Sequence, residues 1–328
     1  MRFLLQRLGF FLLTLWAAIT VNFLIPRLMP GDPAGAMMAR FHGRLNPSAV
    51  QAMAIAFGVD THTSLWTQYV EYLHNTVTGN FGTSLTYFPL SVSSQIAQAA
   101  PWTLGLIGVV TVLAFVGGTL IGTVSGWRRG GVVDSILPPV FVVTSALPYF
   151  WVGMMLILFF SVWTNGALPN DGAYSLDAVP GLSFPFIADV LQHALLPALT
   201  ILATSIGAWI LTMRNNMVTV LAEDYVRMAR AKGLSNRRIM YQYAARNAML
   251  PNLAGFAMSL GFVVAGAILV EYVFNYPGLG YMLLNAVNNL DYPLMQALFL
   301  LITVAVLVAV LICDFLTAWL DPRARSAS

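Results

Sequence analysis

The stretch WTLGLIGVVTVLAFVGGTLIGTVSG, residues 102–126, decides the fold class because it contains no charged side chain. It exceeds the length of about 20 apolar residues that an α-helix needs to span a bilayer. In lipid, every backbone N–H and C=O group needs a partner within the protein, and a helix supplies those partners locally. The stretch therefore predicts a membrane-spanning helix.

The composition of the whole chain supports a membrane protein. Of its 328 residues, 58% are hydrophobic and only 9% are charged, whereas a soluble domain carries about 25% charged residues. The net charge of +3 is interpreted as an orientation signal in a membrane, and no nucleic-acid partner is expected. The single cysteine, Cys313, excludes an internal disulfide and any CxxC metal or redox site.

Five further uncharged windows are long enough to span a bilayer. They run from Leu8 to Ile25, between Ser135 and Trp163, from Leu191 to Met213, between Arg246 and Glu271, and between Asp291 and Asp314. The first window follows Arg2 and Arg7 like a secretory signal, but no small-x-small cleavage site follows it, so we expect a retained span. The fold class expected is an all-α, polytopic transmembrane bundle with six spans.

Basic residues are unevenly distributed between the two sides that six spans define. Of the 16 Lys and Arg residues, the following fall on one side: Arg2, Arg7, Arg128, Arg129, Arg214, Arg227, Arg230, Lys232, Arg237, Arg238, Arg246, Arg323 and Arg325. The opposite loops, 164–190 and 271–292, contain none. The positive-inside rule assigns the basic side to the cytoplasm, so both termini are expected there.

The expected organisation has four parts: an N-terminal transmembrane helix (1–28), an extracytoplasmic segment (29–100), a core membrane domain (101–320) with a cytoplasmic loop at 214–250, and a cytoplasmic tail (321–328). Within the second part, apolar residues recur at helical spacing: Leu65, Trp66, Tyr69, Val70, Leu73 and Val77. Two interpretations remain open, an amphipathic helix packed on the membrane domain or a docking surface for an external partner.

Small residues recur every fourth position in the second span, at Gly118, Gly122 and Gly126. This spacing lets two helix backbones approach closely in lipid, where no hydrophobic drive brings helices together. Tight packing inside one bundle and a dimer interface are both compatible with it, and the former is favoured.

The loop between the fourth and fifth expected spans is the most informative part of the chain. Acidic Glu223 and Asp224 precede basic Arg230 and Lys232, an order that suits the dipole of a short helix, and Gly233 is a natural terminator. A second helical run, 236–250, is expected to end at Pro251, where the fifth span begins. A connecting loop does not need two amphipathic helices, although anionic lipid headgroups would also attract its bases.

Residues 224–234 resemble the cytoplasmic signature of binding-protein-dependent ABC importer permeases, in the form found in the dipeptide/oligopeptide (peptide/nickel) transport family. Arg227-Met228-Ala229 replaces the Glu-Ala-Ala of the broader superfamily, as is typical of the peptide branch. Further motifs of that family follow in order along the chain: Pro30-Gly31-Asp32-Pro33, Gly79-Asn80-Phe81-Gly82-Thr83-Ser84, Arg246-Asn247-Ala248-x-Leu250-Pro251, Glu271-x-Val273-Phe274-x-x-Pro277-Gly278-Leu279-Gly280, Asp291-Tyr292-Pro293 and Asp321-Pro322-Arg323.

The resemblance implies a type I ABC importer permease fold in a bacterial or archaeal plasma (inner) membrane. It implies a homologous second permease, two cytoplasmic ATPase subunits or domains that bind ATP and Mg²⁺, and an extracytoplasmic solute-binding protein, with membrane lipid around the bundle. It also implies a coupling helix that contacts the ATPase through Asp224, Tyr225, Val226, Arg227, Ala229, Arg230, Ala231, Lys232, Gly233 and Leu234. Peptides are the expected substrate, with oligosaccharides or nickel complexes as alternatives.

Other classes of protein fit the sequence less well. A P-loop needs a Gly-Lys pair, but the only lysine, Lys232, follows Ala231; no cofactor is expected in this chain. An ion-coupled transporter usually buries acids at mid-membrane, and the spans contain only Asp314, near one end. An enzyme or metal site would need converging residues, and His42, His62, His74 and His193 lack metal-ligand spacing.

Overall fold

The computed structural model describes residues 2–29, 63–265 and 267–320, and every regular element in these ranges is a helix. The motifs at 30–33 and 321–323, residues 30–62 of the expected extracytoplasmic segment (29–100) and the expected tail (321–328) therefore lie outside the described residues. Four helices are long and apolar enough to cross a membrane: α1 (Arg2–Leu28), α5 (Val92–Trp127), α8 (Phe184–Val220) and α15 (Tyr292–Leu320). The expected spans in these four regions are helices, each longer than its uncharged window.

The expected third span is not one straight helix. It consists of α6 (Val132–Ala146) and α7 (Tyr149–Ile157), which is extended by a π-helical turn, η1 (Leu158–Val162); the pair is bent by 99°. The bend falls at Leu147-Pro148, where Leu147 has an extended ψ of 141°. A residue before proline avoids the helical region because of a clash with the proline ring. If the pair forms one span, the described helices include five candidate spans.

The expected fifth span is also interrupted. Helix α12 (Leu250–Val263) has 14 residues, and α13 (Ile268–Val273) follows after a break. On the N-terminal side, helical backbone runs through α10 (Asn236–Arg238), the π-helix η2 (Ile239–Ala245) and α11 (Arg246–Ala248) almost directly into α12. The second helical run of the loop thus ends at Ala248, and α12 begins at Leu250, close to the expected boundary at Pro251. Proline lies in the first turn of α12, where its missing N–H costs nothing.

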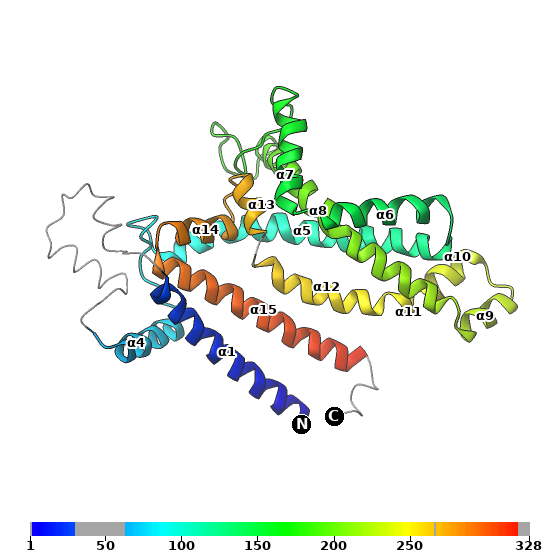
Figure 1. Ribbon diagram of the computed structural model, residues 1–328, viewed down its shortest axis with the longest axis horizontal. Helices are drawn as coiled ribbons and strands as arrows, with labels where there is room; N and C mark the ends of the chain where they lie inside the picture. The colour runs from blue at the N-terminus through cyan, green and yellow to red at the C-terminus, as the bar shows by residue number, and fades with distance from the viewer. Residues whose placement is uncertain (1, 30–62, 266, 321–328) are drawn as a thin grey trace.

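The helices form a bundle in which each packs on its neighbours in space (Figure 1). The contacts connect α1 to α15, α15 to α12, α12 to α5, α5 to α8 and α8 to α6. Helix α9 (Asp224–Ala231) lies at the end of α8, at the right of Figure 1, and α14 (Leu279–Asn288) and α4 (Leu65–Thr78) lie toward the opposite end.

Helices α5 and α8 share the most extensive contact in the bundle, and the glycines of α5 lie in it. A methyl group on Gly122 would lie 2.6 Å from the carbonyl oxygen of Ile210 and 2.7 Å from Cβ of Met213. Gly118 and Gly126 face the same helix, beside Trp209 and Met217. The three glycines thus serve packing within the chain, as favoured from the sequence.

Candidate coupling surface

Helix α9 begins and ends as its sequence predicts. Asp224 lies in its first turn and Arg230 in its last, each complementing the helix dipole. The chain then leaves the helix through Gly233 at φ +72°. The N–H of Gly233 donates to the carbonyl of Arg230 (2.9 Å), and that of Leu234 donates to Ala229 (3.3 Å). This pair of bonds is a Schellman ending, which needs a left-handed residue and so favours glycine.

Two small apolar side chains attach α9 to the bundle. Val226 is fully buried and Ala229 is 3% exposed. Together with Ile239 they pack against the ends of α5 and α8, the turn after α9 and the π-helix η2, which contribute Trp127, Val220, Leu221, Leu234 and Tyr243. Burial of a valine side chain stabilises a protein by about 1.5–3 kcal/mol, so this footprint holds a helix of eight residues in place without burying its charges.

Two polar contacts add to this apolar footprint. The guanidinium of Arg230 lies 5.7 Å from the centroid of the Trp127 ring, within the range of a cation–π contact. The hydroxyl of Tyr225 accepts a hydrogen bond from Nδ2 of Asn247 (2.9 Å). The first contact joins α9 to the end of α5, and the second joins it to α11, which leads into α12.

The remaining predicted site residues are on the outer surface. Asp224, Tyr225, Arg227, Arg230, Ala231, Lys232 and Gly233 are exposed, and Leu234 is half-buried. An Arg227–Asp224 ion pair at 3.5 Å is open to solvent and contributes little to stability. The ten residues thus form one short helix and its end, with charge outward. Such a surface can dock in a groove of complementary charge on another protein.

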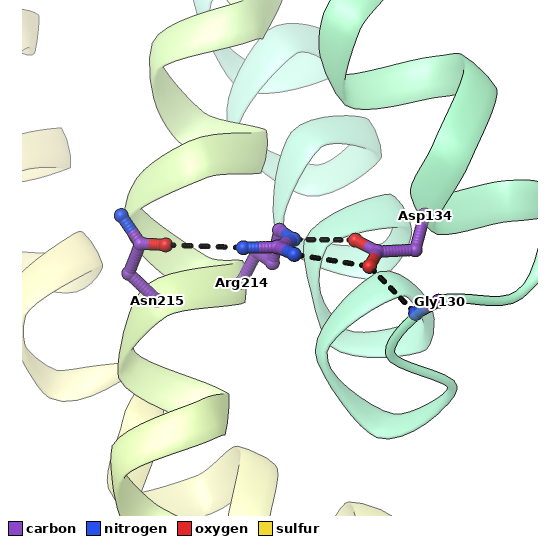
Figure 2. A network of polar contacts seen from close by, with 4 residues as sticks. All are labelled: Gly130, Asp134, Arg214 and Asn215. Atoms are coloured by element: carbon purple, nitrogen blue, oxygen red, sulfur yellow. Dashed lines mark hydrogen bonds and ion pairs between the residues drawn. The ribbon is translucent and has the colours of Figure 1, made fainter.

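An ion pair between α6 and α8 was not predicted from the sequence. Arg214 of α8 makes a bidentate contact with Asp134 of α6, and the N–H of Gly130 donates to the same carboxylate at 2.9 Å (Figure 2). Asn215 also contacts Arg214. The Asp134 side chain is 6% exposed and that of Arg214 26%. The signal that could have found it is an acid in the first turn of a helix after the Gly130-Gly131 turn.

At the opposite end of the bundle, the carboxylate of Glu271 is fully buried. Its Oε1 accepts from Oγ1 of Thr103 (2.8 Å), and its Oε2 accepts from the N–H groups of Gly280 (2.7 Å) and Tyr281 (3.0 Å). The latter two belong to the first turn of α14, where a negative charge complements the helix dipole. Burial raises the pKa of Glu271, against the lowering effect of these donors.

Asp291 forms a second buried anchor at that end. It is fully buried and accepts hydrogen bonds from Oγ of Ser84 and from the N–H groups of Thr86 (2.7 Å) and Leu294 (3.2 Å). It therefore ties the loop before α5 to the start of α15. Their position in the sequence predicts an outer loop for Glu271 and Asp291 and gives no sign that they are buried.

His193 is a packed residue of α8. It is 8% exposed, and its Nδ1 lies 2.9 Å from the carbonyl oxygen of Asp189, one turn earlier. The carboxylate of Asp189 accepts from both the N–H and the hydroxyl of Ser175 (2.7 Å each). His193 therefore contacts its own helix, and the Asp189 carboxylate fastens the loop that precedes α8.

The fold and composition define a polytopic helical membrane protein. The family described as binding-protein-dependent transport system inner membrane component matches residues 118–326, which include α9, Asp134, Arg214, Glu271 and Asp291. The chain belongs to this family, so it is an inner-membrane component of a transport system.

Relatives extend the similarity to nearly the whole chain. The di/tripeptide transport system permease protein DppB of Pseudomonas aeruginosa is 33% identical, with 98% of each chain covered. The dipeptide transport system permease protein DppB of Lactococcus lactis is 31% identical over 99% of each chain. The oligopeptide transport system permease protein AppB of Bacillus subtilis is 32% identical over 92% of each chain.

Proposed function

We propose that this chain is one of two permease subunits of an ATP-driven importer and forms half of its pathway for peptides. The peptide assignment is supported by three relatives that are permeases for di/tripeptides, dipeptides or oligopeptides. Oligosaccharides and nickel complexes are substrates that the same machinery could carry, and none of these three relatives favours them.

Six spans with both termini in the cytoplasm fit the arrangement of the helices. The spans would be α1, α5, the bent α6–α7 pair, α8, the run leading through α12, and α15. The threading is supported by the position of charge, because Arg128, Arg129 and the bases around α9 follow the same ends of α5 and α8 (Figure 1). Reporter fusions at residue 130 and residue 177 test it: the first should report the cytoplasm and the second the outside.

The single observation that carries the mechanism is the construction of α9. Its apolar footprint joins it to the ends of α5 and α8, while its charged side chains are exposed. We infer that residues 224–234 dock in a groove of a separate ATPase, which holds the ATP and Mg²⁺. Closure of two such ATPases would move each α9 and, through the short turn after α8, rock the bundle as a rigid body between its two open states.

The opposite end of the bundle would meet the solute-binding protein. The loops at 164–190 and 271–292 and the described part of the 29–100 segment are the proposed docking surfaces. Glu271 and Asp291 support this role because they hold the turns at that end in fixed positions.

Uptake by the reconstituted complex tests the function. The tagged chain is copurified with its partners, placed in proteoliposomes with the binding protein, and given labelled dipeptide, oligosaccharide or nickel chelate. We expect ATP-dependent uptake of the dipeptide alone. A chain that purifies without ATPases and accumulates solute on an ion gradient would instead be a secondary transporter.

Gly233 tests the coupling role. Its left-handed conformation costs a non-glycine residue about 1–2 kcal/mol, but no atom lies within 4 Å of the position that a Cβ would occupy. Gly233→Trp should therefore insert into the membrane normally yet lose most ATP-driven uptake, because the indole occupies the contact surface. Gly233→Asn is the matched control, since asparagine tolerates this conformation; it should retain more uptake. Equal uptake by both variants and by the unmodified protein would contradict the assignment.

A further inference from the structure

Helix α4 carries three distinct faces. One face docks on the last turns of α1: Oγ1 of Thr20 lies 2.7 Å from the hydroxyl of Tyr69, and Nδ2 of Asn22 donates to the hydroxyl of Tyr72 (2.9 Å). The ring of Phe23 lies between them, 5.2 Å from that of Tyr69 and 5.6 Å from that of Tyr72. The helix is therefore held on α1 at a defined rotation.

The other two faces differ in chemistry, and all their residues are exposed except the half-buried Leu73. The apolar stripe consists of Trp66, Val70, Leu73 and Val77, at i, i+4, i+7 and i+11, with Trp66 71% and Val77 87% exposed. One residue further on, with the same spacing, the polar stripe consists of Thr67, Glu71, His74 and Thr78, all exposed. A helix with an apolar stripe beside a polar stripe, and with a third face packed on another helix, is suited to a boundary between water and an apolar phase.

Arg27 locates that boundary along α1. Its guanidinium lies 3.7 Å from the centroid of the Phe23 ring, and its Nε and Nη2 donate to Oε1 of Gln68 on α4 (3.1 and 3.0 Å). A cation at the end of an apolar span marks the level of the headgroups, because its stem stays in the apolar region while its charge reaches water. Helix α4 contacts α1 at this level.

The aromatic residues at the junction fit the same level. The ring of Trp66 lies 5.9 Å from that of Tyr69, which contacts Phe23. Trp and Tyr are enriched at membrane–water interfaces because their rings are apolar and their polar atoms reach water. On α1, Val21, Leu24, Ile25 and Leu28 are also exposed beside the docked residues, so the surface around the junction is apolar.

We propose that α4 lies in the bilayer interface at the C-terminal end of α1, with Trp66, Val70, Leu73 and Val77 inserted among the lipid chains. Its polar stripe then faces water, and α4 anchors the start of the membrane domain to one leaflet. This site goes beyond the proposed function, because it requires a membrane and does not depend on the solute. In the six-span threading the leaflet is the outer one.

Spin labels on single cysteines test the placement in the complete transporter in nanodiscs of phosphatidylethanolamine and phosphatidylglycerol. Cys313→Ala is the parent, and cysteines replace Trp66, Val70 or Val77 on the apolar stripe, with Thr67, Glu71 or Thr78 as matched controls one residue away. We expect the ratio of oxygen to nickel-chelate accessibility to be several-fold higher at each apolar position than at its neighbour.

Two results would overturn the proposal. Equal ratios on both stripes would place α4 in water. Protection of the apolar positions from both reagents would mean that a protein covers the stripe, which is the docking surface that the sequence left open. All six substitutions are on exposed positions, so they leave the contacts with α1 intact.

Discussion

The two ends of the molecule hold charged residues in opposite ways. At the α9 end, Arg227 and Lys232 are exposed, and the helix is attached through Val226 and Ala229. At the α14 end, Glu271 is fully buried and accepts three hydrogen bonds. The exposed charges contribute little to the fold and are free to meet a partner, whereas the buried charge fixes a turn. A transporter needs both an exposed surface that a partner can contact and a rigid region that keeps its conformation.

The largest effect is expected from removing the buried carboxylate. Glu271→Ala leaves the donors of Thr103, Gly280 and Tyr281 without an acceptor, and each buried donor left without a partner costs about 1–3 kcal/mol. Thermal unfolding followed by size-exclusion chromatography measures the loss. Glu271→Gln is the control, because its carbonyl oxygen can still accept the two backbone N–H groups; it should unfold at a higher temperature than Glu271→Ala. Equal unfolding temperatures would show that the network does not hold α14.

The Arg214–Asp134 pair, which joins α6 to α8, tests whether the half of the bundle nearer α9 also relies on a buried charge. Arg214→Met leaves Asp134 with the N–H of Gly130 alone, and we expect a loss of about 2–4 kcal/mol. Adding Asp134→Leu should recover much of that loss, because no charge then remains buried. If the double variant is no more stable than Arg214→Met, the pair does not act as a unit.

A smaller effect is expected from pH. Because burial raises the pKa of Glu271 above its ordinary value of 4.5, the folded protein binds this proton more tightly than the unfolded chain. The resulting stability is complete below that ordinary value and is lost as the pH rises through the folded-state pKa. The unfolding temperature of the unmodified protein, relative to that of Glu271→Gln, should therefore fall as the pH rises from about 4.5. A constant difference would show that the two states bind the proton equally.

The smallest effect on stability is expected at the exposed bases. Arg227→Ala and Lys232→Ala remove no buried contact, so the unfolding temperature should stay within the error of the measurement. ATP-driven uptake should nevertheless fall several-fold, because these side chains face the proposed ATPase. Loss of stability without loss of uptake would reverse the comparison between the two ends.

Features that depend on neighbours in sequence could be predicted. The apolar windows predicted the four long helices. The acidic start, the basic end and Gly233 predicted α9. The apolar spacing from Leu65 to Val77 gave α4. In each case the signal and the structure that it determines are a few residues apart. Membership of the binding-protein-dependent family was also predicted and is confirmed by the match over residues 118–326.

Features that depend on distant partners could not be predicted. Glu271 meets Thr103, Asp291 meets Ser84, and Asp134 meets Arg214 only after the helices pack. Their charges suggested loops, since burial of an acid is costly unless donors surround it. The 99° bend between α6 and α7 and the short α12 were missed for a related reason. An uncharged window indicates how many residues can lie in the membrane, but not whether they form one continuous helix.

The glycine contact between α5 and α8 has a mechanical consequence. At Gly122 even a methyl group would clash with α8, so a larger side chain brought to this contact by sliding would clash too, and we expect the two helices to tilt together. Helix α8 has 37 residues and, at 1.5 Å per residue, is about 55 Å long. A tilt of about 10° around its midpoint would displace each end by about 5 Å in opposite directions. A displacement of α9 by about 5 Å would thus produce a movement of the same size, about one turn of helix, in the opposite direction at the far end of α8.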